Sequence, residues 1–149
     1  MPSSPTDLDP TPAASARTVS TEPLDRRIVL SGLWTSMLFV FAYVDIFGFF
    51  RADVLEGALA GVIPGPGFAI DQTFLAATTL YILVPSLMVV GCLLLPYRVS
   101  RRANLVLAVL YMGTIVASMV GETWAYYLVG SAVEVGLLAA VAAVAVRWR

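Results

Sequence analysis

Four long apolar stretches, separated by shorter polar ones, make up most of this chain. They cover about residues 28–50, 73–95, 104–121 and 126–146. An α-helix needs about 20 predominantly apolar residues to cross the hydrocarbon layer of a bilayer. The pattern therefore predicts an all-α protein, in which residues 28–149 form a bundle of four transmembrane helices.

The polar stretch 51–72 is long for a link between neighbouring helices, and it contains an apolar stripe of its own. The stripe has helical spacing, at positions i, i+1, i+4, i+5 and i+8: Val54, Leu55, Ala58, Leu59 and Val62. We expect a short interfacial helix there, ended by Gly61 and the run of prolines and glycines at 64–67. Two roles are open for it: a lid over an outward-facing cavity, or a plain connector on the membrane surface.

The first 27 residues differ in kind from the rest of the chain. They are rich in Pro, Ser, Thr and Ala and contain almost no large apolar side chains. Such a segment cannot bury enough apolar surface to offset the chain entropy that is lost on folding. Residues 1–27 are therefore predicted to be a disordered leader on the cytoplasmic side.

The composition supports a membrane protein and excludes several classes of function. Hydrophobic residues make up 59% of the chain and charged residues 13%, whereas a soluble domain is nearer a half and a quarter. The net charge is −1, and no basic cluster indicates a nucleic-acid partner. The chain has no His and a single Cys, Cys92, so we expect neither a metal site nor a bound cofactor. The lipid bilayer is the expected partner; a homo-oligomer and a small-molecule ligand are left open.

The arginines predict the direction of the spans. One set lies before the first span, between the second and third, and after the fourth: Arg26, Arg27, Arg98, Arg101, Arg102, Arg147 and Arg149. The opposite links carry only Arg51, against Asp53, Glu56, Asp71 and Glu122. Links rich in arginine stay in the cytoplasm, so both termini are expected inside.

Three further residue patterns predict details of the bundle. Rows of small residues at every fourth position indicate faces where helices pack closely: Gly113, Ala117 and Gly121, and Ala132, Gly136 and Ala140. Pro85 should kink the second span, because proline cannot donate a helix hydrogen bond. Asn104 is expected to be the N-cap of the third span, a position that Asn favours.

Two acids interrupt the apolar runs. Asp45 lies in the first span and Glu134 in the fourth, at expected depths of roughly 8 and 12 Å below the outer surface. A carboxylate at a helix centre costs about 2.5–3.5 kcal/mol on insertion, so an acid there is a functional-site candidate by default. Tyr43 and Tyr81 are candidate hydrogen-bond partners, and Arg51 is the candidate counter-ion.

Three interpretations of these acids remain open. They could hold helices together through interhelical hydrogen bonds. They could form a site for proton-coupled transport of a small molecule, because acids inside the membrane mark proton relays. An enzyme would have to work with carboxylates and tyrosines alone, since the sequence has no His, no paired Cys, no phosphate loop and no Ser-base arrangement. No residue is therefore assigned a catalytic role.

Short motifs in three spans resemble one known family. They are Leu33-Trp34 with the run 43–48, Tyr97-Arg98 with the run 102–104, and Tyr126-Tyr127 with Glu134 and the run 147–149. Over residues 30–149 the chain resembles domain-of-unknown-function family six-three-two-six, small bacterial four-span proteins that are DoxX-like in overall shape. The resemblance implies a four-helix bundle in the bacterial inner membrane and no established activity. The likeness to DoxX-like proteins adds a third functional alternative, a redox or quinone-associated membrane subunit.

Overall fold

A computed structural model describes residues 25–148 of the chain. Within them the protein forms five α-helices: α1 (Arg26–Gly48), α2 (Ala52–Leu59), α3 (Gln72–Leu94), α4 (Tyr97–Ser118) and α5 (Ala125–Arg147). No regular strand occurs in this range, where an isolated bridge joins Val62 to Ala69. The all-α prediction is confirmed. Most of the predicted leader lies outside the described residues, and its last two residues begin α1.

The four long helices give the molecule the character of a multi-pass membrane protein. Each has 22 or 23 residues and is apolar enough to cross a bilayer, and each is about 33–35 Å long at 1.5 Å per residue. Large apolar side chains point outward, and those of Phe39, Leu80 and Val129 are more than 60% exposed on the bundle. Glu134 and Asn104, in contrast, are buried. A protein in water places its side chains the other way round.

The predicted bounds agree with α1, α3 and α5 within two residues, but α4 begins seven residues before the predicted start of its span. Apolar residues identify only the part of a helix inside the hydrocarbon. The first turns of α4 carry three arginines and extend beyond it, directly after Pro96. The prediction that Asn104 caps this helix is therefore wrong, because Asn104 lies in its third turn.

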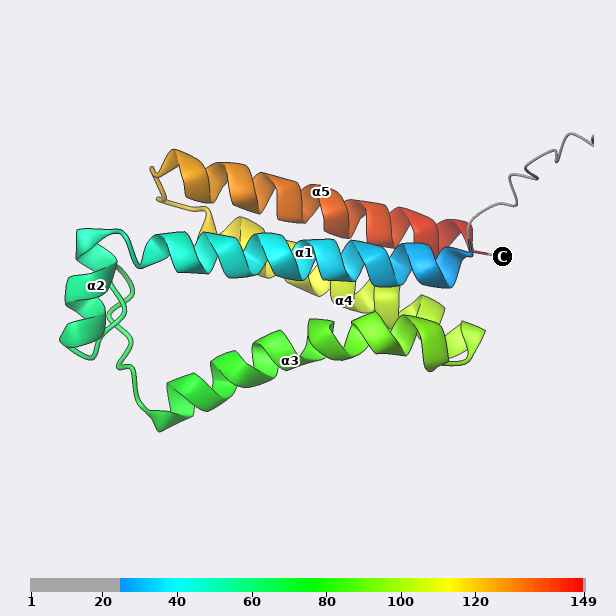
Figure 1. Ribbon diagram of the computed structural model, residues 1–149, viewed down its shortest axis with the longest axis horizontal. Coiled ribbons are helices and arrows are strands. Elements are labelled where there is room, and N and C mark those ends of the chain that lie inside the picture. Colours follow the sequence, from blue (N-terminus) through cyan, green and yellow to red (C-terminus); the bar gives the residue numbers. More distant parts are fainter. Residues whose placement is uncertain (1–24, 149) are drawn as a thin grey trace, which may run out of the picture.

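The helices pack unevenly around α1, which contacts both α3 and α5, while α4 packs on α5 (Figure 1). Helix α3 has little contact with α4. Its N-terminal half diverges from α1 toward the end that carries α2, and it bends along its length (Figure 1). The bundle is therefore tight where α3 ends and open where α3 begins.

Pro85 accounts for the bend in α3 and for one contact between helices. Because Pro85 has no N–H, the carbonyl oxygen of Tyr81, four residues earlier, loses its partner within the helix. The hydroxyl of Tyr111 on α4 donates a hydrogen bond to that oxygen. The two tyrosine rings lie 4.7 Å apart between centroids. The predicted kink thus fixes the position of Tyr81 on the inner face of α3.

The tight part of the bundle contains a buried polar network. The indole N–H of Trp34 donates to the side-chain oxygen of Asn104 at 2.7 Å, and the thiol of Cys92 donates to the same atom at 3.4 Å. The amide nitrogen of Asn104 donates to the carbonyl oxygen of Ser100 at 2.8 Å. All four side chains are completely buried. The network joins α1, α3 and α4, and a buried network whose groups are paired makes the core rigid.

The rows of small residues do not mark the packing faces within the described bundle. A Cβ added at Gly113 or Gly136 would meet nothing within 4 Å. The close approach is at Gly130, where an added Cβ would overlap Cγ2 of Val44. Within the described chain the predicted packing faces are therefore wrong: α1 and α5 approach each other at a glycine outside both rows.

The two ends of the bundle differ in charge. At the end formed by the start of α1, the α3–α4 link and the end of α5, which we call the basic end, arginines bond to helix carbonyls. Arg27 donates to Leu93, Arg26 to Arg147, and Arg101 to Ala145 and Val146. These bonds satisfy the carbonyl groups that a helix C-terminus leaves open. The opposite end, which we call the acidic end, holds α2, the loop after it and the α4–α5 turn.

Helix α2 is the predicted short helix, and it lies across the acidic end (Figure 1). It stops at Leu59, and Gly61 follows with a φ of 72°, a conformation that suits glycine. The loop then folds on itself through the bridge between Val62 and Ala69. Leu59 is 82% exposed, so part of the apolar stripe faces outward, as expected for a helix at a membrane surface.

Candidate functional site

A cavity of about 560 Å³ opens between the four long helices in the half of the bundle nearer the acidic end. Its apolar wall is formed by side chains of α1, α3, α4 and the loop after α2: Phe41, Val44, Phe68, Phe74 and Ile115. Its polar wall consists of seven side chains: Asp45, Tyr81, Thr114, Ser118, Tyr127, Ser131 and Glu134. The cavity exists because α3 leaves the bundle on the N-terminal side of Pro85.

Glu134 lies deep in the polar part of the cavity wall. It lies nine residues into α5, so about 13–14 Å from the start of that helix. Its side chain is 3% exposed, and its Oε1 atom has no hydrogen-bond partner among the described residues. Buried polar atoms are nearly always paired, and an unpaired one costs about 1–3 kcal/mol. The carboxyl group therefore has a buried acceptor atom that none of the described residues pairs with.

Asp45 lies on the same cavity at a different depth. It is three residues from the end of α1, so about 4–5 Å from that helix terminus, and it is exposed. Asp45 is thus near the mouth of the cavity, while Glu134 is deep inside it. The sequence placed the two acids at similar depths, and the structure places them at the two levels of one cavity. No hydrogen bond between them is described.

Two hydroxyl pairs complete the polar wall. The hydroxyls of Tyr81 and Thr114 lie 2.7 Å apart, and the hydroxyl of Tyr127 donates to Ser118 at 2.9 Å. Thr114 in turn donates to the carbonyl oxygen of Tyr111, and Ser118 donates to that of Ile115. Tyr81, one of the predicted partners of the acids, therefore faces the cavity but donates its hydroxyl proton to Thr114.

Tyr43 and Arg51, the other two predicted site residues, do not line the cavity. Tyr43 is 56% exposed on the outside of α1, and its ring packs against that of Phe47 at 6.1 Å. A residue two positions before Asp45 faces nearly the opposite side of a helix. Arg51 bonds to Asp53 and Glu122 and not to Asp45.

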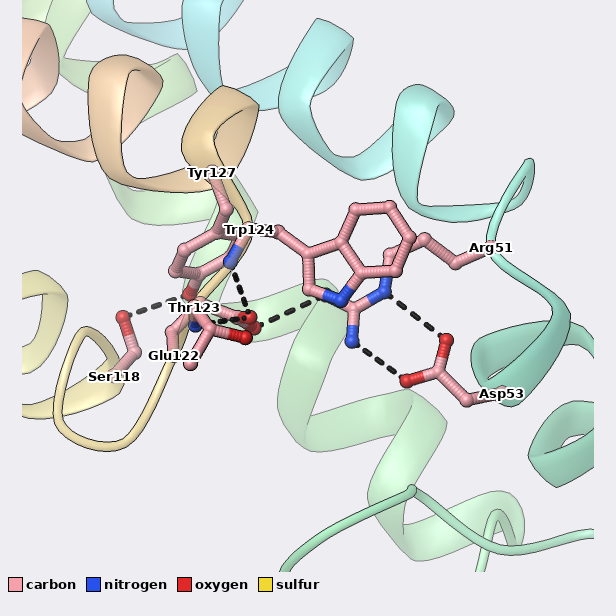
Figure 2. Close-up of polar contacts among 7 residues, drawn as sticks. All are labelled: Arg51, Asp53, Ser118, Glu122, Thr123, Trp124 and Tyr127. Atoms are coloured by element: carbon pink, nitrogen blue, oxygen red, sulfur yellow. Dashed lines mark hydrogen bonds and ion pairs between the residues drawn. The ribbon is translucent and has the colours of Figure 1, made fainter.

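Figure 2 shows the contacts of Arg51, which with Asp53, Glu122 and Trp124 forms what we call the Arg51 cluster. Arg51 donates from Nη2 and Nε to both oxygens of Asp53, at 2.6 and 3.1 Å. Its Nη1 atom donates to Glu122 at 3.1 Å, and its guanidinium lies 4.6 Å from the centre of the Trp124 ring. The cluster joins the α1–α2 link to the α4–α5 turn at the acidic end.

The charges of the Arg51 cluster support one another. The hydrogen bond from Arg51 lowers the pKa of Asp53, and the bond to Asp53 raises the pKa of Arg51. Partial burial raises the pKa of Glu122, but hydrogen bonds from the backbone of Trp124 and Thr123 and from Arg51 outweigh this effect and lower it. Both acids therefore stay ionised, and Arg51 is committed to them.

Sequence reasoning missed much of the cavity wall, although the sequence contains a signal for part of it. Tyr127, Ser131 and Glu134 follow one another at i, i+4 and i+7, which places them on one face of α5. Thr114 and Ser118 have the same spacing on α4. Polar stripes of this kind in otherwise apolar spans indicate the inner face. No comparable pattern identifies Phe68, which reaches the cavity through the fold of its loop.

The titratable groups of the cavity are carboxylates and tyrosines. Among residues 25–148, no three His, Cys, Asp or Glu side chains lie close enough together to hold a metal ion. Chemistry at this site therefore has two acids, hydroxyl groups and aromatic rings to work with. These groups can accept hydrogen bonds, exchange protons and bind cations.

Comparison with known proteins gives a family and no function. A family model described as "Family of unknown function (DUF6326)" matches residues 21–149, more than four fifths of the chain. This match confirms the resemblance that the motifs of the first, third and fourth spans indicated. No curated protein and no solved structure matches the sequence.

Proposed function

We propose that this chain, which belongs to the family of unknown function DUF6326, is a proton-coupled carrier of a small molecule in the bacterial inner membrane. The cavity between the long helices binds the molecule, and Asp45 and Glu134 take up and release the protons that are exchanged for it. The observation that carries the proposal is the carboxyl group of Glu134. Its Oε1 atom is buried without a partner among the described residues, on the wall of a cavity that holds a second acid.

The Oε1 atom of Glu134, unpaired among the described residues, favours this function over a purely structural role. An acid that only joins helices would direct its oxygens to donors on a neighbouring helix, as Asn104 does with Trp34. Glu134 Oε1 has no such donor within residues 25–148. Protonation removes the charge of the carboxyl group, and a donor on a ligand pairs with the ionised group; alternation between the two states couples ligand binding to proton release.

The two levels of the cavity give the proton a path. Asp45 at the mouth exchanges protons with the aqueous side, and Glu134 holds a proton or the ligand at the bottom. Acids that face the interior of a membrane bundle commonly serve as proton relays. The volume of about 560 Å³ lies in the range of small-molecule sites.

The charges at the two ends support an orientation with both termini in the cytoplasm. Six arginines belong to the basic end within the described residues, and they adjoin helix termini there: Arg26, Arg27, Arg98, Arg101, Arg102 and Arg147. By the positive-inside rule this end faces the cytoplasm, so the cavity opens outward. A reporter that is active only in the cytoplasm, fused after Arg149, should be active; activity of a periplasmic reporter instead would reverse the orientation.

Purified protein in liposomes that contain a pH-sensitive dye tests the carrier function. A library of cationic, neutral and anionic small molecules is added outside, and proton movement is followed for each compound. At least one compound should move protons, and Glu134→Gln and Asp45→Asn should abolish the movement. Tyr43→Phe is the matched control, because Tyr43 lies on α1 but not on the cavity, and it should behave like the wild type.

The same variants separate the carrier from a structural role. If no compound moves protons and both acid variants lower the melting temperature, the acids stabilise the bundle and the carrier proposal is wrong. If movement persists in Glu134→Gln, the carrier works through another residue and the site is misplaced.

A further inference from the structure

We infer that the ligand of this cavity is a small organic ammonium ion with at least one N–H group and an apolar body. This inference rests on the proposed function, since it names the class of molecule that the same cavity accepts. It follows from the hydrogen-bonding capacity of the wall, from its charge and from its aromatic side chains.

The polar wall offers acceptors and almost no free donors. A carboxylate only accepts hydrogen bonds, whereas a hydroxyl can do both. The proton of Thr114 goes to the carbonyl of Tyr111, so in the contact with Tyr81 the tyrosine is the donor. Both hydroxyl protons of this pair are therefore used within the protein, and what the pair can still offer a ligand is lone pairs.

The second hydroxyl pair has the same arrangement. Ser118 donates to the carbonyl of Ile115 at 2.7 Å, and Tyr127 donates to Ser118. Four of the five hydroxyl protons on the wall are thus committed inside the bundle, and the fifth belongs to Ser131, whose hydroxyl makes no hydrogen bond among the described residues. A ligand that binds here therefore meets more acceptors than donors, and Oε1 of Glu134 is a buried acceptor that has no partner among the described residues.

The wall that the described residues form carries two acidic side chains and no basic one. Asp45 and Glu134 line the cavity, while no Lys or Arg of the described residues does. Arg51, the basic residue of the acidic end, is held by Asp53 and Glu122 and only 13% of its side chain is exposed. An anion would meet two acids without a cation, which in a medium of low dielectric constant is strongly unfavourable. A cation meets complementary charge at both levels.

The apolar wall fits a cation with a hydrocarbon body. Phe41, Phe68 and Phe74 line the cavity together with the rings of the two tyrosines. Aromatic faces attract cations, by about 2 kcal/mol or more where water is excluded, and they also pack against hydrocarbon. These residues therefore suit an amine with an aliphatic or aromatic chain better than a bare metal ion or a highly hydrated polyamine.

The need for an N–H group separates protonated amines from quaternary ammonium ions. A quaternary nitrogen brings charge but no donor, so it would leave Oε1 of Glu134 unpaired. A protonated amine supplies both. It also replaces the proton of Glu134 one for one in charge, which is the exchange that the carrier requires: the carboxyl O–H bond breaks, the proton passes to water at the mouth of the cavity, and the ammonium pairs with the carboxylate.

A matched set of four compounds tests the inference: 4-phenylbutylamine, its N,N,N-trimethyl derivative, 4-phenylbutanol and 4-phenylbutyrate. They share the apolar body and differ in the head group. Binding to detergent-purified protein is measured by titration calorimetry at neutral pH. The amine should bind tightest, the trimethyl compound at least several-fold more weakly, the alcohol more weakly still, and the carboxylate not at all.

Variants locate the binding. Glu134→Gln should reduce the affinity for 4-phenylbutylamine at least tenfold, and Tyr43→Phe should leave it unchanged. If Glu134→Gln does not fold, Asp45→Asn serves instead, because Asp45 is exposed and its replacement spares the packing. It should weaken amine binding several-fold, and added salt should reduce the difference between this variant and the wild type.

The outcomes distinguish this inference from the proposed carrier. If the alcohol or the carboxylate binds as tightly as the amine, or if the acid variants leave amine binding unchanged, the ammonium assignment is wrong. If a neutral or anionic library compound then moves protons and the movement depends on Glu134, the proposed carrier function is supported although the ammonium assignment is wrong. Amine binding that depends on Glu134 without any proton movement in liposomes would support the ammonium site and overturn the carrier.

Discussion

Replacing Tyr111 by Phe should destabilise the bundle for a reason that depends on Pro85. The Tyr111 hydroxyl donates to the carbonyl oxygen of Tyr81, which is free because Pro85 has no N–H. Phe keeps the ring, including its edge-to-face contact with Trp34 at 6.2 Å. The substitution therefore removes one hydrogen bond and little packing.

The size of the effect follows from the burial of the site. Tyr111 is 4% exposed, so water does not take the place of the hydroxyl. An unpaired buried acceptor costs about 1–3 kcal/mol, whereas hydrogen bonds between membrane helices are worth about 0.6 kcal/mol on average and about 1.7 at most. We expect Tyr111→Phe to lower the free energy of unfolding by about 1–1.5 kcal/mol, toward the upper part of the membrane range because the acceptor has no helical partner.

The test compares the cost of Tyr111→Phe in the wild type with its cost in a protein that also carries Pro85→Ala. Alanine restores the N–H at position 85, and the carbonyl of Tyr81 regains a partner within α3. In that background the cost of Tyr111→Phe should fall below about 0.5 kcal/mol, so the two substitutions should be strongly non-additive. Unfolding by SDS titration in mixed micelles, followed by tryptophan fluorescence, gives the four free energies of the cycle.

One outcome of this double-mutant cycle would contradict the prediction. If Tyr111→Phe costs the same in the wild-type and in the Pro85→Ala background, the hydroxyl does not replace the missing helix bond, and the account of the bend in α3 is refuted. A change in the overall stability of Pro85→Ala does not affect this conclusion, because the comparison uses differences between paired variants.

Three further predictions concern other parts of the bundle. Gly130→Ala should cost about 1–3 kcal/mol in unfolding free energy, because the added methyl overlaps a side chain of α1, whereas Gly136→Ala, where the site is open, should be neutral in the same titration. Asn104→Leu should cost about 1–3 kcal/mol by leaving a buried indole N–H unpaired, and equal stability would show that the network is dispensable. The lowered pKa values of the two acids in the Arg51 cluster mean that its contribution is complete above their ordinary values of 3.8 and 4.5 and is lost as the pH falls through the lowered ones. The emission of Trp124 should therefore change in acid, below about pH 4, and a change near neutrality instead would contradict the assignment.

Much of the fold could be predicted because it depends on local properties of the chain. Twenty or so consecutive apolar residues can satisfy their backbone in a bilayer only as a helix, so the spans follow from composition alone. The short helix α2 follows from helical spacing and from the glycines after it. The kink at Pro85 is equally local, since proline lacks the N–H wherever it stands.

Predictions that required knowledge of partners were less successful. Asn104 has the residue type of an N-cap, but it lies inside α4. Its side-chain amide accepts a hydrogen bond from Trp34 of α1 and donates one to the carbonyl oxygen of Ser100. The rows at Gly113 and Gly136 have the spacing of a packing face, yet they face away from the bundle. The type of a residue and its spacing along the helix limit the contacts that it can make. The arrangement of the helices decides which of these contacts form.

The candidate site shows the same division. The sequence by itself determined that Asp45 and Glu134 are costly residues in apolar spans and hence that they need a reason to be there. Only the tertiary structure decided that both line one cavity, that Arg51 is bound by Asp53 and Glu122, and that an oxygen of Glu134 is left without a partner among the described residues. The physical reason is that insertion into a membrane depends on the apolar content of each span separately, whereas pairing and cavity formation depend on how the spans bend and lean against one another.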